Sequence, residues 1–204
     1  MVLGVLAWVK RDWLVARAYI LVLEWDWRVK KLQVDRVTGV LGILPGQKIA
    51  DLGAGSGVFT RSLAREVGPD GVVYAVDVSR ELLDYVEESS SEQGLSNIRT
   101  IMATSDDPCL PEPVDLIFIC DTLHHIAERA EYLKTMRSYL RPSGRVAIID
   151  FIKSPHLCSS SKYPLTELER WLQEAGYQPA GRYTFLQDNF FVIYVCPTCP
   201  ASVP

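Results

Sequence analysis

The sequence has no apolar run long enough to cross a bilayer and no dense run of basic residues. Its N-terminal apolar stretches, residues 1–9 and 18–23, fall short of the roughly 18–20 residues that span a membrane. Lys10 and Arg11 follow the first stretch, whereas a secretory signal carries its positive charges first. We therefore expect a soluble, cytoplasmic protein. The net charge of −4 argues against nucleic acid as the main partner.

Cysteine is also scarce. The chain of 204 residues has five cysteines, an odd number that is widely spread, which favours a reducing compartment. Cys196 and Cys199 form a lone C-x-x-C with no second pair to complete a zinc site. We expect neither a metal site nor a redox centre there.

What the chain does contain is an alternation of short apolar runs and helix-like segments from residue 47 onward. Strands are predicted at 48–52, 72–77, 98–102, 114–120 and 145–150, with helices at 58–67, 79–93 and 127–140 between them. A further helix is predicted to begin with a capping box at Thr166 and Glu169. Two β-prone runs, 181–187 and 189–196, follow too closely for a parallel crossover and predict an antiparallel hairpin. The pattern is that of an α/β protein, a mostly parallel seven-stranded sheet with helices on both faces and an antiparallel C-terminal hairpin.

Residues 1–45 differ in composition and are predicted to form a separate helical segment. Four of the five tryptophans fall there (Trp8, Trp13, Trp25 and Trp27), and charged residues recur every seven positions along one helical stripe (Lys10, Arg17, Glu24 and Lys31). A second helix is predicted at 32–44. Because the rest of the circumference is mostly apolar, the segment must be covered, and we expect a pocket lid or a homodimer element. Contact with a membrane surface is the alternative. Residues 46–196 form the main domain and 197–204 a disordered tail.

The stretch "DLGAGSG" puts three glycines directly after the first strand. A dinucleotide-binding loop has a third glycine where this chain has Val58, and a P-loop would end in Gly-Lys-Ser/Thr, which is absent. A turn with Gly53, Gly55 and Gly57 instead lets backbone approach a ligand that lacks a phosphate, at the carboxyl end of the strand. Asp77 closes the next strand, where a carboxylate is placed to accept ribose hydroxyls.

These features together resemble the class I S-adenosylmethionine-dependent methyltransferases, over residues 33–195, and imply their Rossmann-like fold. The stretches "SDDPCLPEPVDLIFICDTLHHI" and "LRPSGRVAIIDF" are similar to the small-molecule branch typified by ubiquinone/menaquinone-biosynthesis methyltransferases. The resemblance implies S-adenosyl-L-methionine as cofactor. The implied cofactor-binding residues are Asp51, Gly53, Ala54, Gly55, Gly57, Asp77, Val78, Thr104, Ser105, Asp106 and Asp121.

Within that set, Asp51 is expected to hold the methionine ammonium group, directly or through water, and Asp77 the ribose hydroxyls. Simpler interpretations are that Asp51 caps its turn and that Asp77 only precedes a helix. Members of this branch commonly carry Gly-Asp-Ala after the third strand, with the aspartate on the adenine amino group. This chain has Ala103, Thr104 and Ser105 there, so either Asp106 serves instead or the contact is lost.

His124 and His125 follow the fourth predicted strand, where the cofactor and substrate pockets of the family meet. Imidazole titrates near neutral pH, so one of the two is a candidate base or orienting group, and a surface pair that starts a helix is the alternative. Asp121 lies on the same wall.

We expect the N-terminal segment and the loop 153–163 to form the pocket for the methyl acceptor. Their aromatic residues favour an acceptor that is small and apolar or aromatic. The expected function is methyl transfer by in-line displacement, and the alternative is a non-catalytic or regulatory partner subunit that binds S-adenosylmethionine. Transfer to proteins or nucleic acids stays open, although no Asn/Asp-Pro-Pro-aromatic motif is present.

Overall fold

The computed structural model describes residues 16–152 and 163–197. Several expectations fall on residues outside these ranges. They concern Trp8 and Trp13, the charged position Lys10, most of the loop 153–163 and the tail after residue 197. Within the described ranges, no helix combines the length and the apolar character needed to cross a bilayer.

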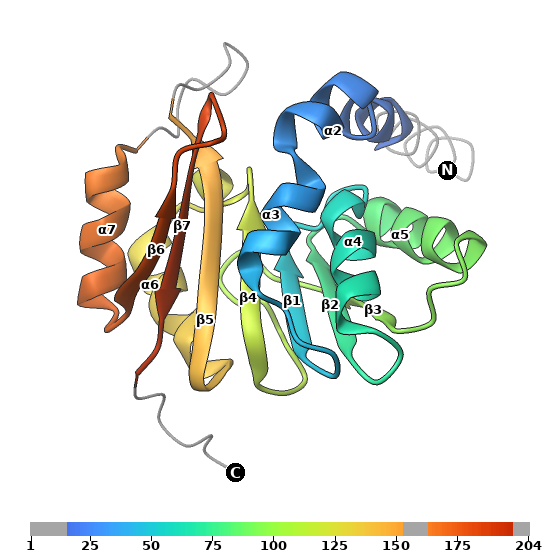
Figure 1. Cartoon of the computed structure of the whole chain (residues 1–204). Helices are drawn as coiled ribbons and strands as arrows, with labels where there is room; N and C mark the ends of the chain where they lie inside the picture. Colours follow the sequence, from blue (N-terminus) through green and yellow to red (C-terminus); the bar gives the residue numbers. More distant parts are fainter. Residues whose placement is uncertain (1–15, 153–162, 198–204) are drawn as a thin grey trace, which may run out of the picture.

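One seven-stranded sheet forms the centre of the molecule (Figure 1), with the strand order β3-β2-β1-β4-β5-β7-β6. The strands are β1 (Lys48–Leu52), β2 (Val72–Asp77), β3 (Ile98–Met102), β4 (Val114–Cys120), β5 (Leu140–Phe151), β6 (Gln178–Tyr183) and β7 (Asn189–Val195). The first five pair in parallel, and β7 runs antiparallel to both β5 and β6. The predicted α/β class, the strand count and the antiparallel hairpin are confirmed.

Helices cover both faces of the sheet, as predicted. One face packs against α3 (Val34–Leu41), α4 (Val58–Val67) and α5 (Arg80–Glu92), and the other against α6 (Arg129–Ser138) and α7 (Leu165–Glu174). Strand β4 lies between these layers, and Leu116, Ile117 and Phe118 are fully buried there. Burying one such side chain stabilises the fold by about 1.5–3 kcal/mol, which explains the unbroken apolar run in the sequence.

The N-terminal segment departs from the single striped helix that the sequence predicted. Residues 16–23 are helical, Glu24 and Trp25 interrupt the helix, and α2 (Asp26–Leu32) and α3 follow. Trp25 has an extended backbone (φ −61°, ψ 126°), so Lys31 does not continue the stripe of Arg17 and Glu24. Tertiary contacts account for the break, because Glu24 pairs with the buried Arg61 of α4.

Three element boundaries near the C-terminus also differ from the predictions. Helix α7 begins at Leu165 after Pro164 and has no side-chain cap, so the capping box at Thr166 was wrong. Strand β6 spans Gln178–Tyr183 instead of 181–187, because an edge strand tolerates Pro179 beside a bulge. Strand β5 spans Leu140–Phe151 instead of 145–150, so it includes the residues "RPSG" before the predicted start.

Cys196, directly after β7, is disulfide-bonded, contrary to the expectation of reduced thiols, and Cys199 lies outside the described residues.

Candidate functional site

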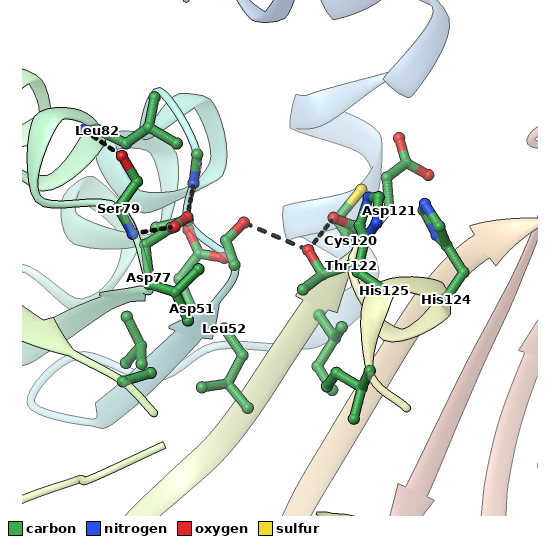
Figure 2. Close-up of a pocket in the computed structure, with 18 of the residues that line it drawn as sticks. Asp51, Leu52, Asp77, Ser79, Leu82, Cys120, Asp121, Thr122, His124 and His125 are labelled. Carbon is green, nitrogen blue, oxygen red and sulfur yellow. Dashed lines mark hydrogen bonds between the residues drawn. The ribbon is translucent and has the colours of Figure 1, made fainter. Parts of the chain in front are cut away.

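A cavity of about 1210 Å³ opens at the carboxyl edge of the sheet, where β1 and β4 lie side by side although they are far apart in the chain. This is the point at which an α/β sheet reverses its strand order and binds ligands. Among the predicted site residues, only Gly57 does not line the cavity. In Figure 2, Asp51, Asp77 and Ser79 lie on one side and Asp121, His124 and His125 on the other.

The glycine loop needs its glycines for two physical reasons. Gly53, Gly55 and Gly57 all have positive φ angles, of 72°, 56° and 81°. A Cβ on Gly53 would lie 2.2 Å from Oγ1 of Thr122, so this glycine makes room for the loop after β4. A Cβ on Gly57 would lie 2.9 Å from Val86 of α5. Gly57 therefore serves as the left-handed N-cap of α4 and as a packing position, not as part of the cavity wall.

Asp77 fastens this loop to the end of β2. Its Oδ2 accepts a hydrogen bond from the backbone N–H of Gly55 (2.9 Å), and its Oδ1 accepts one from that of Ser79 (3.0 Å). Ser79, the first residue of the predicted helix, in turn caps α5 by accepting a hydrogen bond from the N–H of Leu82. Each carboxylate oxygen of Asp77 keeps a lone pair for a ligand hydroxyl.

Asp51 lies at the end of β1, and only 2% of its surface is exposed. Its Oδ2 accepts a hydrogen bond from Oγ1 of Thr60 in α4 at 2.6 Å. Burial raises the pKa of Asp51 to about 7, with a further contribution from the nearby charge of Asp77. A positively charged partner would stabilise the ionised form of this buried carboxylate.

The loop after β3 carries the three residues expected at the adenine end. Oγ1 of Thr104 donates to Oδ1 of Asp106 (2.9 Å) and accepts from the N–H of Asp107 (3.1 Å), which closes a compact turn. Thr104, Ser105 and Asp106 all line the cavity beside Val78, which is 66% exposed. Their contact with adenine stays a prediction.

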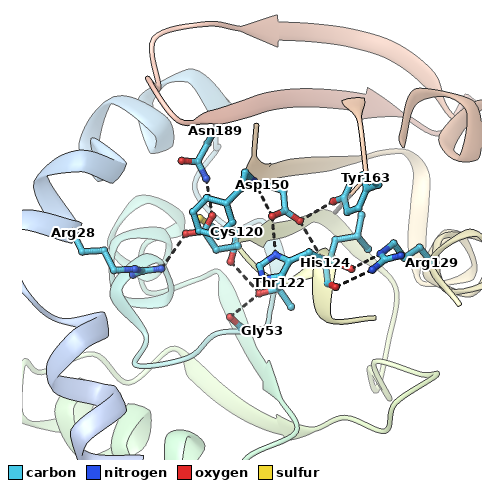
Figure 3. Close-up of polar contacts among 12 residues, drawn as sticks. Arg28, Gly53, Cys120, Thr122, His124, Arg129, Asp150, Tyr163 and Asn189 are labelled. Carbon is cyan, nitrogen blue, oxygen red and sulfur yellow. Dashed lines mark hydrogen bonds and ion pairs between the residues drawn. The ribbon is translucent and has the colours of Figure 1, made fainter. Parts of the chain in front are cut away.

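Asp121 has both carboxylate oxygens engaged by protein groups. Arg28 of α2 forms an ion pair with Oδ2 (3.2 Å), and Asn189 of β7 donates to Oδ1 (2.7 Å). Figure 3 labels these two partner side chains. Asp121 has a positive φ of 52°, which is unusual for a residue with a side chain. Burial raises its pKa to about 6, although Arg28 opposes the shift. Its expected contact with the cofactor stays a prediction; in the structure it joins the N-terminal segment to the hairpin.

His124 is held by Asp150 at the end of β5. Nδ1 of the imidazole lies 2.8 Å from Oδ1 of Asp150, and the backbone N–H of His124 donates to Oδ2 at 3.1 Å. Asp150 also accepts a hydrogen bond from the backbone N–H of Phe151 (2.9 Å) and one from the hydroxyl of Tyr163 (2.7 Å). Figure 3 shows Asp150 between His124 and Tyr163.

Four donated hydrogen bonds fill the capacity of an ionised carboxylate. Because an ionised carboxylate only accepts hydrogen bonds, the contact with Asp150 assigns the donor role to Nδ1 of His124, and in the neutral imidazole Nε2 is then the acceptor. Within the part of the chain that the structure describes, Nε2 has no hydrogen-bond partner, and His124 lines the cavity. Burial and the charge on Asp150 raise the pKa of the Tyr163 hydroxyl, so Tyr163 stays a neutral donor.

The ring of His125 packs against that of His124, with centroids 4.0 Å apart and the planes tilted by 44°. Burial, and then the neighbouring His124, lower the pKa of His125 below the ordinary value of histidine. It also lines the cavity but is more exposed than His124. The two predicted candidates therefore differ, because only His124 has a carboxylate to orient it.

Sequence reasoning missed Asp150, Tyr163, Arg28 and Asn189. Asp150 had a visible signal, because it ends a predicted strand as Asp51 and Asp77 do. Arg28 and Asn189 had none, since their contact with Asp121 joins positions 93 and 68 residues away in the chain. Among the described residues, no group of three or more His, Cys, Asp or Glu side chains is arranged to hold a metal ion.

Comparison with known proteins places residues 43–179 within a family described as "Methyltransferase domain". The chain is 30% identical over 114 residues to the ubiquinone/menaquinone biosynthesis C-methyltransferase UbiE of Vibrio parahaemolyticus. That match covers 55% of this chain and 44% of the relative, so the chain spans less than half the length of that protein.

Solved structures share the fold. A SAM-dependent methyltransferase from Aquifex aeolicus superposes with a TM-score of 0.79 at 26% identity, covering 88% of this chain and 97% of that one. Magnesium protoporphyrin IX methyltransferase from Synechocystis, solved with bound SAM, has a TM-score of 0.66 at 19% identity. It covers 83% of this chain and 81% of its own, and at that identity the likeness concerns the fold alone.

Proposed function

The chain belongs to the family described as "Methyltransferase domain". From that premise we propose that it is a class I S-adenosylmethionine-dependent methyltransferase, which methylates a small apolar or aromatic acceptor with His124 as general base. The observation that carries the proposal is the hydrogen bond from Nδ1 of His124 to Asp150, which leaves Nε2 as an acceptor at the cavity.

The residues around the cavity fit the cofactor. Asp77 has lone pairs left for two ribose hydroxyls, and the buried Asp51 favours a positively charged group such as the methionine ammonium. The volume of about 1210 Å³ exceeds the roughly 300–1000 Å³ of a pocket for one small ligand, which supports the binding of two.

When bound, S-adenosylmethionine supplies a methyl group on a positively charged sulfur, and transfer breaks the carbon–sulfur bond as the bond to the acceptor forms. The chain's contribution is to hold the acceptor atom in line, which lowers the barrier by roughly 7–11 kcal/mol at best. Nε2 of His124 accepts the proton that a hydroxyl, phenol or acidic carbon loses. Asp150 stabilises the imidazolium that results and keeps the ring in one orientation.

The apolar or aromatic nature of the acceptor is supported by the side chains on the acceptor side of the cavity. Tyr19 and Val22 of the N-terminal helical stretch line it together with Phe59 and Phe151. Polar side chains line the same cavity, among them Thr122, His124 and His125, and can orient a bound molecule through hydrogen bonds.

The test is transfer of labelled methyl from S-adenosylmethionine to quinols, phenols and amines by the full chain. We expect His124→Gln to lower kcat by about 10²–10⁴ while binding of S-adenosylhomocysteine is retained. Asp150→Asn is expected to lower kcat and to shift its dependence on pH, because the remaining amide no longer fixes the tautomer of His124.

His125→Gln is the matched control, since it removes the neighbouring imidazole of the pair, and its kcat should change by less than about threefold. A protein that binds the cofactor but methylates no acceptor of any class, or a His124→Gln variant as active as the wild type, would contradict the proposal.

A further inference from the structure

The N-terminal segment is buried on one side and apolar on the other. Ile20 and Leu23 are each only 8% exposed and fix residues 16–23 to the protein. Five of the nine large apolar side chains that are exposed in the described part of the chain fall within nine consecutive residues of this segment. They are Tyr19 (49%), Leu21 (73%), Val22 (52%), Trp25 (64%) and Trp27 (64%), which we call the aromatic surface.

The same segment is basic in an acidic protein. The first 32 residues contain six Lys and Arg against three Asp and Glu, whereas the remaining residues contain 15 against 22. Within the described part, Lys30 is exposed next to the aromatic surface. Nζ of Lys31 lies 5.0 Å from the ring centroid of Trp27 and also pairs with Asp188, and Asp26 is the one exposed acidic residue between the two tryptophans. Exposed tryptophans among basic residues are the composition of a segment that lies in the headgroup region of an anionic bilayer.

We propose that the aromatic surface docks the protein on an anionic lipid membrane. A symmetric dimer through this surface would bring two positively charged segments together, which opposes association. An anionic lipid surface attracts the basic side chains and accepts the tryptophan rings, so it satisfies both features at once.

The surface is continuous with the mouth of the cavity. Tyr19 and Val22 belong to the aromatic surface and also line the cavity, while Leu23 beside them lies near Gly55. A docked protein therefore opens its cavity toward the lipid, and an apolar molecule passes from the bilayer to the site without crossing water. This step rests on the proposed function and implies a methyl acceptor that is dissolved in the membrane.

The experiment is co-sedimentation of the full chain with phosphatidylcholine vesicles, with and without phosphatidylglycerol. We expect binding to the anionic vesicles that weakens with added salt, and little binding to the neutral ones. The double variant Trp25→Ala/Trp27→Ala should weaken binding by about tenfold or more. Neither tryptophan lines the cavity, so binding of S-adenosylhomocysteine should be unchanged and reports that the variant is folded.

Leu44→Ala/Met102→Ala is the matched control, because both residues are exposed and apolar but lie outside the aromatic surface and the cavity. It should bind vesicles as the wild type does. The proposal is overturned if the wild type stays in the supernatant, if the tryptophan variant binds equally well, or if the tryptophans instead hold a dimer in sedimentation velocity. None of these readouts needs methyl transfer, so a failure of the proposed function leaves them interpretable.

Discussion

At the scale of single residues, Asp51 and Asp121 are two carboxyl groups whose charge changes near physiological pH. Both lie at the carboxyl edge of the sheet, and burial raises their pKa values to about 7 and about 6. In the folded chain without cofactor, Asp51 is therefore only partly ionised at neutral pH. The methionine ammonium group is expected to require the ionised form.

Cofactor affinity should consequently depend on pH. Below pH 7 the affinity for S-adenosylhomocysteine should fall by about tenfold per pH unit, because each unit costs the binding equilibrium about 1.4 kcal/mol. Asp51→Asn should weaken binding at pH 8 and abolish this dependence, as measured by calorimetric titration. The exposed variant Asp70→Asn is the control. Equal pH dependence in Asp51→Asn and the wild type would show that another group is responsible.

The same pKa predicts the opposite effect on stability. The pKa of Asp51 is higher in the folded chain than the ordinary value of 3.8, so its contribution to stability is present below about pH 4 and is lost as the pH rises toward 7. Without cofactor, Asp51→Asn should therefore be about 2–4 kcal/mol more stable than the wild type at pH 8 and no more stable at pH 4. Urea unfolding at the two pH values measures this difference.

At the scale of elements, the glycine loop is constrained by both backbone angle and space. Gly53→Ala meets both penalties, since its φ is +72° and its Cβ would overlap Thr122. The backbone strain costs about 1–3 kcal/mol and the overlap a similar amount. We expect the free energy of unfolding of Gly53→Ala, measured in urea, to be lower than that of the wild type by the sum of these two costs. The variant should also bind the cofactor weakly, because the loop must shift.

Substitutions at two other glycines distinguish the cost of backbone strain from the cost of steric overlap. Gly42 has a φ of +57° and open space, so Gly42→Ala should show the strain alone. Gly39 lies inside α3 with nothing within 4 Å and no positive φ, so Gly39→Ala should stabilise the protein by about 0.5–1 kcal/mol. If all three variants behaved alike, neither geometry would matter.

The sequence predicted the elements that local patterns specify. Buried runs such as 114–120 and Ser79 before its helix gave the parallel strands and the start of α5 closely. The break at Glu24 and the start of α7 were missed, because tertiary contacts and Pro164 set them, not periodicity. The same holds for the site. Strand-end acids and glycines are visible in sequence, whereas the orientation of His124 depends on Asp150 and Tyr163, which only the fold brings together.

At the scale of the whole molecule, Asp121 joins three distant parts of the chain. It follows β4, pairs with Arg28 of α2 and accepts a hydrogen bond from Asn189 of β7. The pair is mostly buried, with side-chain exposures of 23% for Arg28 and 9% for Asp121. This carboxylate therefore helps to hold the N-terminal segment over the cavity, together with the buried Ile20 and Leu23.

Removing Arg28 should destabilise the protein in a manner that depends on pH. Above the pKa of about 6, Arg28→Gln leaves the charge of Asp121 buried without its cation, which costs about 2–4 kcal/mol. Below pH 5, Asp121 is protonated and the loss should shrink. Adding Asp121→Asn should restore most of the stability at pH 8, because the buried charge is then absent. A loss in Arg28→Gln that is equal at pH 5 and pH 8 in urea unfolding would show that Arg28 acts through packing instead of charge.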